Sequence, residues 1–325
     1  MRQRNNRSLR GALLGWVLAA QCGLACASEA PPRFHVAVPH GTLTFVVYGD
    51  TRFTQRERVA DAGARRALVA GIAAENPAAI FVGGDLVYQG DDPQDYATYR
   101  SETAEWARRE IPVFPALGNH EFRKCEPERD DSPCLENWWR AFEALPLRPH
   151  RWYSVALGDS LRALVLDSDS PLKPGSGQRA WFERELSAAD SDKRVSFILI
   201  LLHYPPVRDP IFPPGRDEAQ VERYLSSRAL TLHARVIVIG SHVHNYERFE
   251  RDGVPYLVSG GGGATPLPVL RMAGELSRLR TSVNFHYLRF TLQGERLTGT
   301  MVRYEATGAA DNPWSEPDRF EISSR

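Results

Sequence analysis

The sequence has no excess charge of either sign, few cysteines, and no repeated or low-complexity segment. Its 325 residues contain 40 Lys and Arg against 40 Asp and Glu, so the formal net charge is zero. Non-specific binding to nucleic acids depends on an overall positive field, and we therefore expect no nucleic-acid partner. Because no repeat or linker interrupts the chain, we predict a single domain after the N-terminal segment.

No apolar run near the N-terminus reaches the length of a comfortable membrane span. Gly11–Ala25 instead has the length of the apolar part of a signal peptide, and the small-x-small pattern Ala25-Cys26-Ala27 follows it. We therefore predict a signal peptide at residues 1–27, a mature domain at residues 28–325, and export to the periplasm or the medium with no stable membrane span after cleavage. A transmembrane anchor and a lipoprotein cut before Cys26 are the alternatives. The positive residues that precede the apolar run are Arg2, Arg4, Arg7 and Arg10.

The four cysteines are too few for a disulfide-rich scaffold. Cys22 and Cys26 belong to the predicted signal peptide, which leaves Cys125 and Cys134 in a polar segment. A single pair in an exported protein indicates a disulfide that closes a small loop. A pair of metal-binding thiols is the weaker alternative, because no further Cys or His lies between them.

Strands and helices alternate along the first half, which predicts an α/β fold. The strands expected at Leu43–Tyr48, Ala79–Gly83 and Ile111–Leu117 are separated by helices at Gln55–Glu75 and Pro93–Glu110. This βαβαβ order predicts parallel strands covered by helices, with ligands bound at the carboxyl ends of the strands. The second half is less regular. There we expect hairpins at Arg151–Ala156 with Leu161–Leu166 and at Asn284–Leu292 with Leu297–Tyr304, helices at Gln178–Ala189 and Asp217–His233, and strands at Val195–Leu202, Arg235–Ile239 and Val254–Ser259.

Oxygen and nitrogen donors follow most of these strands. They lie in the segments GDTR, GDLVY, GNHE, LLHYPP and SHVHNYER, and comprise Asp50, Asp85, Asn119, His203, His242 and His244, with Tyr88 as a seventh candidate. Carboxylate, amide and imidazole donors without thiolates suit zinc, iron or manganese, and they argue against an iron–sulfur or copper(I) site. Asp85 can give one oxygen to each of two ions. His242 and His244 point to the same side if the backbone there is extended, and they can then serve different ions.

These five segments, in this order, resemble the calcineurin-like metallophosphoesterase superfamily, and most closely its purple acid phosphatase branch. The resemblance runs from about Phe45 to Tyr304. It implies a four-layer α/β/β/α sandwich of two mixed sheets with a dinuclear metal site at the strand ends. It also implies two ions per chain, iron with zinc, manganese or a second iron. By the same resemblance, Asp50, Asp85, Tyr88 and His244 hold the first ion, whereas Asp85, Asn119, His203 and His242 hold the second.

The chain departs from the family pattern at two places. Most of the superfamily has a histidine where this chain has Arg52, and purple acid phosphatases usually have glycine there and use the tyrosine instead. Tyr88 is then either a tyrosinate ligand, which requires a strongly Lewis-acidic ion such as ferric iron, or a packed aromatic residue. Arg52 either pairs with Asp85 or Glu121 or binds the substrate phosphate, which we favour. The additional histidine of purple acid phosphatases is absent from Val207–Gly215.

The resemblance implies an exported phosphoric-ester hydrolase in which a metal-bound hydroxide attacks phosphorus. His120 matches the residue that binds substrate and protonates the leaving oxygen, and Glu121 is expected to orient a ligand or His120. A small phosphomonoester is the first expectation for the substrate. The alternatives are a phosphodiesterase or nucleotidase, and a non-catalytic metal-binding module. The physiological substrate and the oligomeric state are left open.

Overall fold

The computed structural model describes residues 30–38, 41–126, 132–209, 214–269, 279, 282–305 and 312–325. The chain divides into two units, residues 1–30 and 31–325, and the following description concerns the second. The predicted signal peptide at residues 1–27 lies outside the described residues. Within the described residues, no helix combines the length and the apolar character that crossing a bilayer requires.

One sheet has seven strands in the order β1-β5-β6-β7-β8-β10-β9. It is mixed, because β5 and β6 pair antiparallel, as do β9 and β10, whereas β6, β7 and β8 run parallel. The predicted hairpin of β5 and β6 is confirmed. In sheet order the bounds are β1 Arg33–Val36, β5 Tyr153–Leu157, β6 Leu161–Val165, β7 Phe197–Leu201, β8 Arg235–Gly240, β10 Val254–Ser259 and β9 Tyr246–Arg251.

The other sheet has six strands in the order β13-β12-β11-β2-β3-β4. Strands β2, β3 and β4 are parallel, as the βαβαβ pattern predicted, and β11, β12 and β13 extend the sheet antiparallel from β2. The bounds are β13 Trp314–Ser323, β12 Arg296–Tyr304, β11 Phe285–Gln293, β2 Leu43–Tyr48, β3 Ala79–Val82 and β4 Val113–Pro115.

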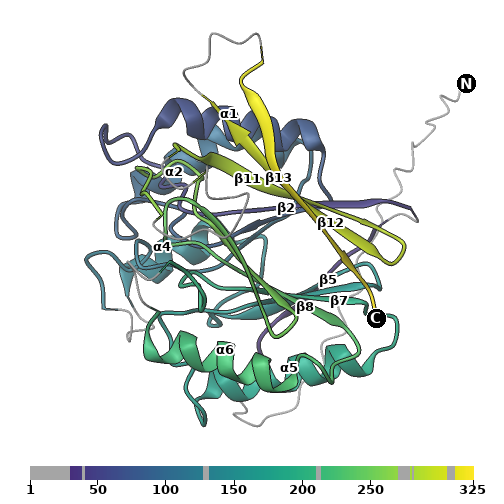
Figure 1. The fold of residues 1–325 in the computed structure, drawn as a ribbon. Coiled ribbons are helices and arrows are strands. Elements are labelled where there is room, and N and C mark those ends of the chain that lie inside the picture. Colours follow the sequence, from purple (N-terminus) through teal and green to yellow (C-terminus); the bar gives the residue numbers. More distant parts are fainter. Residues whose placement is uncertain are drawn as a thin grey trace, which may run out of the picture. The chain divides into compact units, whose positions relative to one another are not determined.

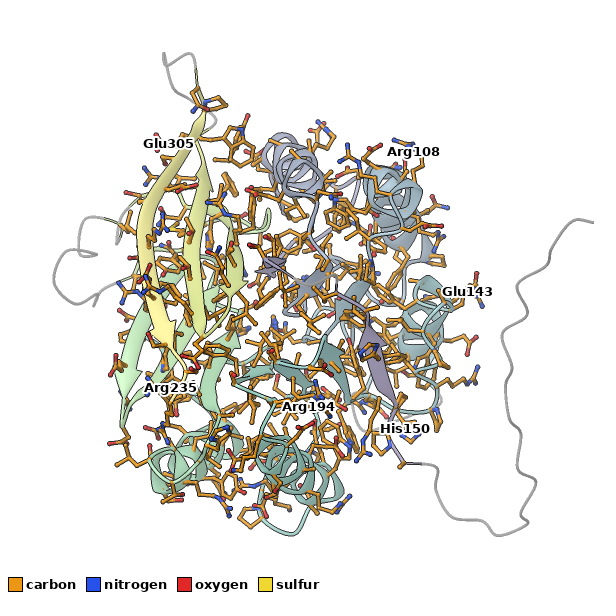
Figure 2. All side chains as sticks on the ribbon, turned by 90° about the vertical axis from the view of Figure 1, so that its right-hand side faces the viewer. Arg108, Glu143, His150, Arg194, Arg235 and Glu305 are labelled. Atoms are coloured by element: carbon orange, nitrogen blue, oxygen red, sulfur yellow. A yellow bond between two sulfur atoms is a disulfide. The ribbon has the colours of Figure 1, made fainter. Side chains whose placement is uncertain are left out.

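Helices cover the outer face of each sheet, which gives the predicted four-layer sandwich (Figure 1). Helix α1 packs on β11 and β12, and α5 packs on β6 and β7. The helices are α1 Ala62–Glu75, α2 Pro93–Glu102, α3 Ala104–Arg108, α4 Pro133–Ala141, α5 Gly177–Ser191 and α6 Arg216–Arg228. Side chains fill the space between the layers, whereas charged groups such as Arg108, Glu143 and Arg194 lie on the outside (Figure 2).

Strand β7 shows why the central strands are apolar throughout. Its residues alternate between the core shared by the two sheets, which receives Leu199 and Leu201, and the core under α5 and α6, which receives Ile198 and Ile200. A strand buried on both faces has no polar face to show, so its sequence is a continuous apolar run. The rigid strands then fix the loops at their carboxyl ends.

Several element boundaries differ from the sequence expectation. Helix α1 begins at Ala62 rather than Gln55, because the Asp61 carboxylate caps it by accepting the amide of Ala64. The helix expected at Pro93–Glu110 is divided at Thr103 into α2 and α3. The predicted disulfide is present between Cys125 and Cys134, where it joins the loop after β4 to the first turn of α4.

Candidate metal centre

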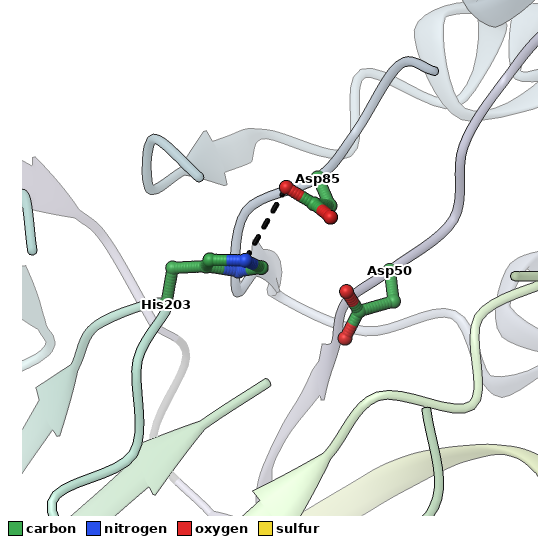
Figure 3. A group of neighbouring side chains, drawn as sticks. All are labelled: Asp50, Asp85 and His203. Atoms are coloured by element: carbon green, nitrogen blue, oxygen red, sulfur yellow. Dashed lines mark ion pairs between the residues drawn. The ribbon is translucent and has the colours of Figure 1, made fainter. Parts of the chain in front are cut away.

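Both sheets direct the carboxyl ends of their central strands to one place. Asp50, Asp85 and Asn119 follow β2, β3 and β4 of the six-stranded sheet. His203 follows β7 of the seven-stranded sheet, and His242 and His244 follow β8. Asp50, Asp85 and His203 each offer a ligand atom, and these atoms lie within 4.8 Å of one another (Figure 3). The expected convergence of donors at the strand ends is therefore present in the geometry.

The loops that carry these donors are strained. The backbones of Asp50, Arg52, Asp85 and His242 have φ values of 55°, 45°, 51° and 66°, in the left-handed region that residues other than glycine seldom adopt. Each such residue costs about 1–3 kcal/mol, and such strain concentrates at functional sites. The value at His242 also corrects one expectation. Residues 241–245 form a turn between β8 and β9 rather than an extended strand, so the two histidines are aimed by that turn.

Two glycines allow the donor loops to approach this closely. A Cβ atom on Gly118 would lie 2.6 Å from Asp85 Oδ1, and one on Gly260 would lie 2.5 Å from Asp50 Oδ2. Real Cβ contacts are not this short, so any larger residue would displace a carboxylate. The Gly260–Gly263 run therefore lets the backbone pass beside Asp50.

Three potential ligand atoms surround His203 Nε2, which is itself the fourth of the group. Nδ1 of His203 donates to the Gly83 carbonyl at 2.9 Å, which leaves the Nε2 lone pair free. That lone pair faces Asn119 Oδ1 at 3.1 Å, His242 Nδ1 at 3.3 Å and Asp85 Oδ1 at 3.3 Å. Metal bonds of about 2.0–2.2 Å place neighbouring ligands roughly 3.0–3.5 Å apart, so these separations match the edges of a coordination polyhedron.

A second group of donors lies around Asp50. The Asp50 carboxylate is fully buried, and neither of its oxygens has a hydrogen-bond partner among the described residues. His244 Nε2 lies 3.7 Å from Asp50 Oδ1, and His244 Nδ1 donates to the Thr265 carbonyl at 2.7 Å. Burying a carboxylate without donors is costly, so this group fits a cation.

Arg52 contacts this second group directly. Its Nη2 lies 3.0 Å from His244 Nε2 and 3.4 Å from Asp85 Oδ2. Because a guanidinium has only donors, Arg52 donates to both atoms. The pairing with Asp85 is one of the alternatives that the sequence left open. No contact with Glu121 is observed among the described residues.

The pKa values of the buried carboxylates and imidazoles are shifted in directions that suit a cation site. Burial and the charge of Asp85 raise the pKa of Asp50 well above its usual value. Burial and the neighbouring His203 lower the pKa of His242 to about 3, and burial and Arg52 lower that of His244 to about 4. Neutral imidazole is the form that binds metals, and a bound cation would relieve the buried carboxylates. The residues present therefore fit metal ions.

Tyr88 has a different environment from the other candidates. Its ring contacts the guanidinium groups of Arg123 at 4.3 Å and Arg56 at 5.6 Å, and it is tilted against the ring of His120. Among the described residues, its hydroxyl makes no hydrogen bond to any of the other donors. Its role as a seventh ligand stays a prediction.

Glu121 holds the loops that carry Asp85 and Asn119. Its buried carboxylate accepts the backbone amides of Leu86 and Val87 on one oxygen, and those of Asp85 and Gly118 on the other. Burial and the charge of Asp85 raise the pKa of Glu121 to about 8, and the amides oppose this shift. These contacts fix the two loops, and the role of Glu121 in orienting a ligand stays a prediction.

His120 lies against the carboxylate of Asp85. Its Nδ1 donates to the Tyr88 carbonyl at 2.6 Å, and its Nε2 lies 3.8 Å from Asp85 Oδ2. The backbone amide of His120 donates to Asp85 Oδ1 at 2.9 Å. Burial lowers the pKa of His120. Because Nδ1 keeps its hydrogen in the bond to the Tyr88 carbonyl, Nε2 is the ring nitrogen that can gain or lose a proton.

The sequence reasoning missed Tyr204. Its ring packs edge-on against His242 at 4.6 Å, and its hydroxyl donates to Asp169 at 3.2 Å. Asp169 is held by Asp167, whose carboxylate pairs with Arg151 at 2.6 Å. The position of Tyr204 directly after His203, at a strand end, was the available signal.

Comparisons with known proteins agree with this geometry. A family model for calcineurin-like phosphoesterases matches residues 43–246. Two Arabidopsis thaliana proteins are similar in sequence. "Probable purple acid phosphatase 20" is 30% identical over 47% of this chain and 38% of its own length, and "Purple acid phosphatase 22" is 25% identical over 87% and 66%. The chain thus spans less than two thirds of either relative.

The fold is similar to that of a solved purple acid phosphatase from yellow lupin (Lupinus luteus) seeds. That structure has a TM-score of 0.68 at 18% identity, and the match covers 87% of this chain and 54% of the lupin chain. At this identity the likeness concerns the fold alone. The family model spans more than half of the chain, and the fold and the donor positions agree with it. The chain therefore belongs to the calcineurin-like phosphoesterase family and resembles its purple acid phosphatase branch.

Proposed function

We propose that this chain is a metal-dependent phosphatase that hydrolyses small phosphate esters at a two-ion site. The observation that carries this proposal is the convergence of buried acceptor atoms from both sheets, with no described hydrogen-bond donor for the Asp50 carboxylate. When bound, the two ions would polarise the phosphoryl oxygens and lower the pKa of bound water. Iron paired with zinc, manganese or a second iron fits the donor chemistry.

Asp85 would be shared between the two ions. Its Oδ1 faces His203 of one donor group, and its Oδ2 faces the Arg52 guanidinium within the other. The donor group around His203 would be completed by Asn119 and His242. Asp50 and His244 complete the other, with Tyr88 as the candidate that would add a tyrosinate and favour ferric iron.

His120 would hold the proton for the leaving oxygen. Its Nδ1 hydrogen is engaged by the Tyr88 carbonyl, so Nε2 is the atom that can carry and release a proton. Burial lowers the pKa of His120, whereas a dianionic phosphate beside it would favour the protonated form. Arg52, part-exposed at the same place, would bind a non-bridging phosphate oxygen once it is free of Asp85.

A phosphomonoester is the proposed substrate class, with a phosphodiester or a nucleotide as the alternative. The discriminating experiment compares the turnover of an aryl phosphomonoester and an aryl phosphodiester by the metal-loaded protein, with and without a chelator. Asp85→Asn should abolish turnover of the preferred ester, whereas Asp159→Asn, a carboxylate on the exposed β5–β6 turn, should not. Metal binding without turnover of either ester would instead favour a non-catalytic metal-binding module.

We also propose that the chain is exported and cut after Ala27, which leaves residues 28–325 as the mature domain. The Cys125–Cys134 disulfide supports an oxidising compartment such as the periplasm or the medium. N-terminal sequencing of the exported protein should begin at Ser28. A lipid-modified N-terminus at Cys26, or a retained leader in the membrane fraction, would contradict this cut.

A further inference from the structure

Arg52 donates a hydrogen bond to His244 Nε2, the lone pair that a metal ion in the Asp50 and His244 group needs. Because Nδ1 of His244 donates to the Thr265 carbonyl, its Nε2 carries no proton and can only accept. Nη2 of Arg52 donates to this Nε2 at 3.0 Å. A lone pair that accepts a guanidinium hydrogen cannot bind a metal ion at the same time.

The same guanidinium also partly neutralises the negative charge of Asp85. Nη2 of Arg52 lies 3.4 Å from Asp85 Oδ2, the oxygen other than the one that faces His203. Two positive charges within a few ångströms repel each other strongly in a buried site. Binding an ion between Asp50, Asp85 and His244 therefore requires Arg52 to leave.

Among the described residues, no cation is bonded to the ligand atoms of the group around His203; the charge of Arg208 acts on His203 and His242 from nearby. Nε2 of His203 faces an amide oxygen, a carboxylate oxygen and a second imidazole nitrogen, all of which are acceptors or can become so. Among the described residues, no guanidinium or ammonium lies within hydrogen-bond distance of these atoms. An ion that enters the group around Asp50 must therefore displace a guanidinium, whereas an ion that enters the group around His203 need not.

Arg52 is also poorly accommodated where it lies. Its Nε is buried and has no hydrogen-bond partner within the described part of the chain, and its backbone has a φ of 45°. Its side chain is 14% exposed, so it can turn outward to where a substrate phosphate would enter. This arrangement suits a side chain with two alternative positions.

We propose that Arg52 competes with the metal ion at His244 for His244 and Asp85, so that the chain binds its two ions with unequal affinity and the ion at His244 displaces Arg52 toward the substrate. This inference rests on the two-ion site of the proposed function. The ion at His203 binds readily. The ion at His244 binds only after the guanidinium contacts are broken, which weakens it about 10- to 100-fold if they match one charge-assisted hydrogen bond.

The test is a zinc titration of the metal-free mature protein by calorimetry, with bound zinc counted after equilibrium dialysis. Wild-type protein should bind one zinc tightly and a second more weakly. Arg52→Gly should tighten the second step about 10- to 100-fold and leave the first unchanged. Arg52→His, which supplies a ligand and tolerates a left-handed backbone, should tighten it at least as much. The affinity of the second step in Arg52→Lys should lie between those of wild-type protein and Arg52→Gly.

Arg58→Gly is the matched control. Arg58 is an exposed arginine of the same loop with a φ of 74°, so the variant removes the same side chain and the same backbone strain, and the titration should not change. His203→Ala should remove the tight step and His244→Ala the weak one. Equal affinity of the two steps in wild-type protein, or an unchanged second step in both Arg52→Gly and Arg52→His, would overturn the proposal. No turnover is measured, so a lack of phosphatase activity would leave this result standing, whereas loss of all zinc binding would remove the two-ion site itself.

Discussion

Glu121 offers the sharpest test of how the donor loops are held. In Glu121→Gln the amide oxygen can replace only one carboxylate oxygen, and the amide NH2 must then face two backbone N–H groups. Those are either the amides of Leu86 and Val87, at 2.8 and 3.2 Å, or those of Asp85 and Gly118, at 2.9 and 2.7 Å. Each buried donor left without an acceptor costs about 1–3 kcal/mol, so leaving two of them unpaired should cost about 2–6 kcal/mol.

The expected effect is a Tm lowered by at least about 4 °C, measured by circular dichroism on metal-free protein at pH 8.5. That pH lies above the pKa of about 8, so the wild-type carboxylate is ionised. Glu121→Ala leaves all four amides unpaired and should cost more than the glutamine variant. Glu57→Gln, which alters an exposed carboxylate, is the control and should leave the Tm unchanged. A Tm for Glu121→Gln within about 1 °C of wild type would refute the reasoning, because the four bonds would then contribute little.

Three further outcomes are expected. His120→Ala should lower turnover of esters with poor leaving groups by about 10²–10⁴-fold while leaving the metal content intact by elemental analysis. Equal losses on nitrophenyl esters would contradict the acid role. Iron-loaded protein should absorb visible light if Tyr88 is a tyrosinate ligand, and Tyr88→Phe should remove the band. A colourless iron form, or a band that survives the substitution, would make Tyr88 a packed aromatic. Metal-free protein should lose thermal stability as the pH rises from about 6.5 to 8. Burial raises the pKa of Glu247 to about 8 and that of Asp50 well above its usual value, so the stability linked to these acids is complete below their unfolded values and is lost as the pH rises through their folded ones. The opposite effect of histidines with lowered pKa, such as His242, is complete above about 6.5. Zinc should reduce the loss, and a Tm that rises across this range without metal would contradict the argument.

The central strands and the positions of the donors were predictable from sequence. Strands such as β2 and β7 are buried on both faces, so their apolar runs stand out, and the residue that ends each run is aimed by a rigid element. Asp50 and His203 were placed at the site for this reason. The family resemblance supplied the second sheet and the four layers, which local patterns alone do not encode.

The elements that escaped prediction have mixed or polar patterns. Strand β13 contains Glu316, Asp318 and Arg319, and it lies at an edge where one face meets solvent. Strand β9 is likewise an edge strand with exposed charges. Strand β1 and helix α4 were also missed, because each lies in a segment interpreted as irregular. The contact between Arg52 and His244 could not be foreseen, because it joins residues 192 positions apart through side-chain geometry.

The division of the donors between the two sheets has a consequence for the newly made chain. Asp50, Asp85 and Asn119 are synthesised first, and they offer only oxygen ligands, which suit weakly held magnesium or manganese. The imidazoles of His203, His242 and His244 follow after a delay on the order of ten seconds at ~5–20 residues per second. The ions that prefer nitrogen can therefore be captured only when both sheets have been made and have docked. The order of donors along the chain thus makes the capture of nitrogen-preferring ions a late event in the synthesis and folding of the domain.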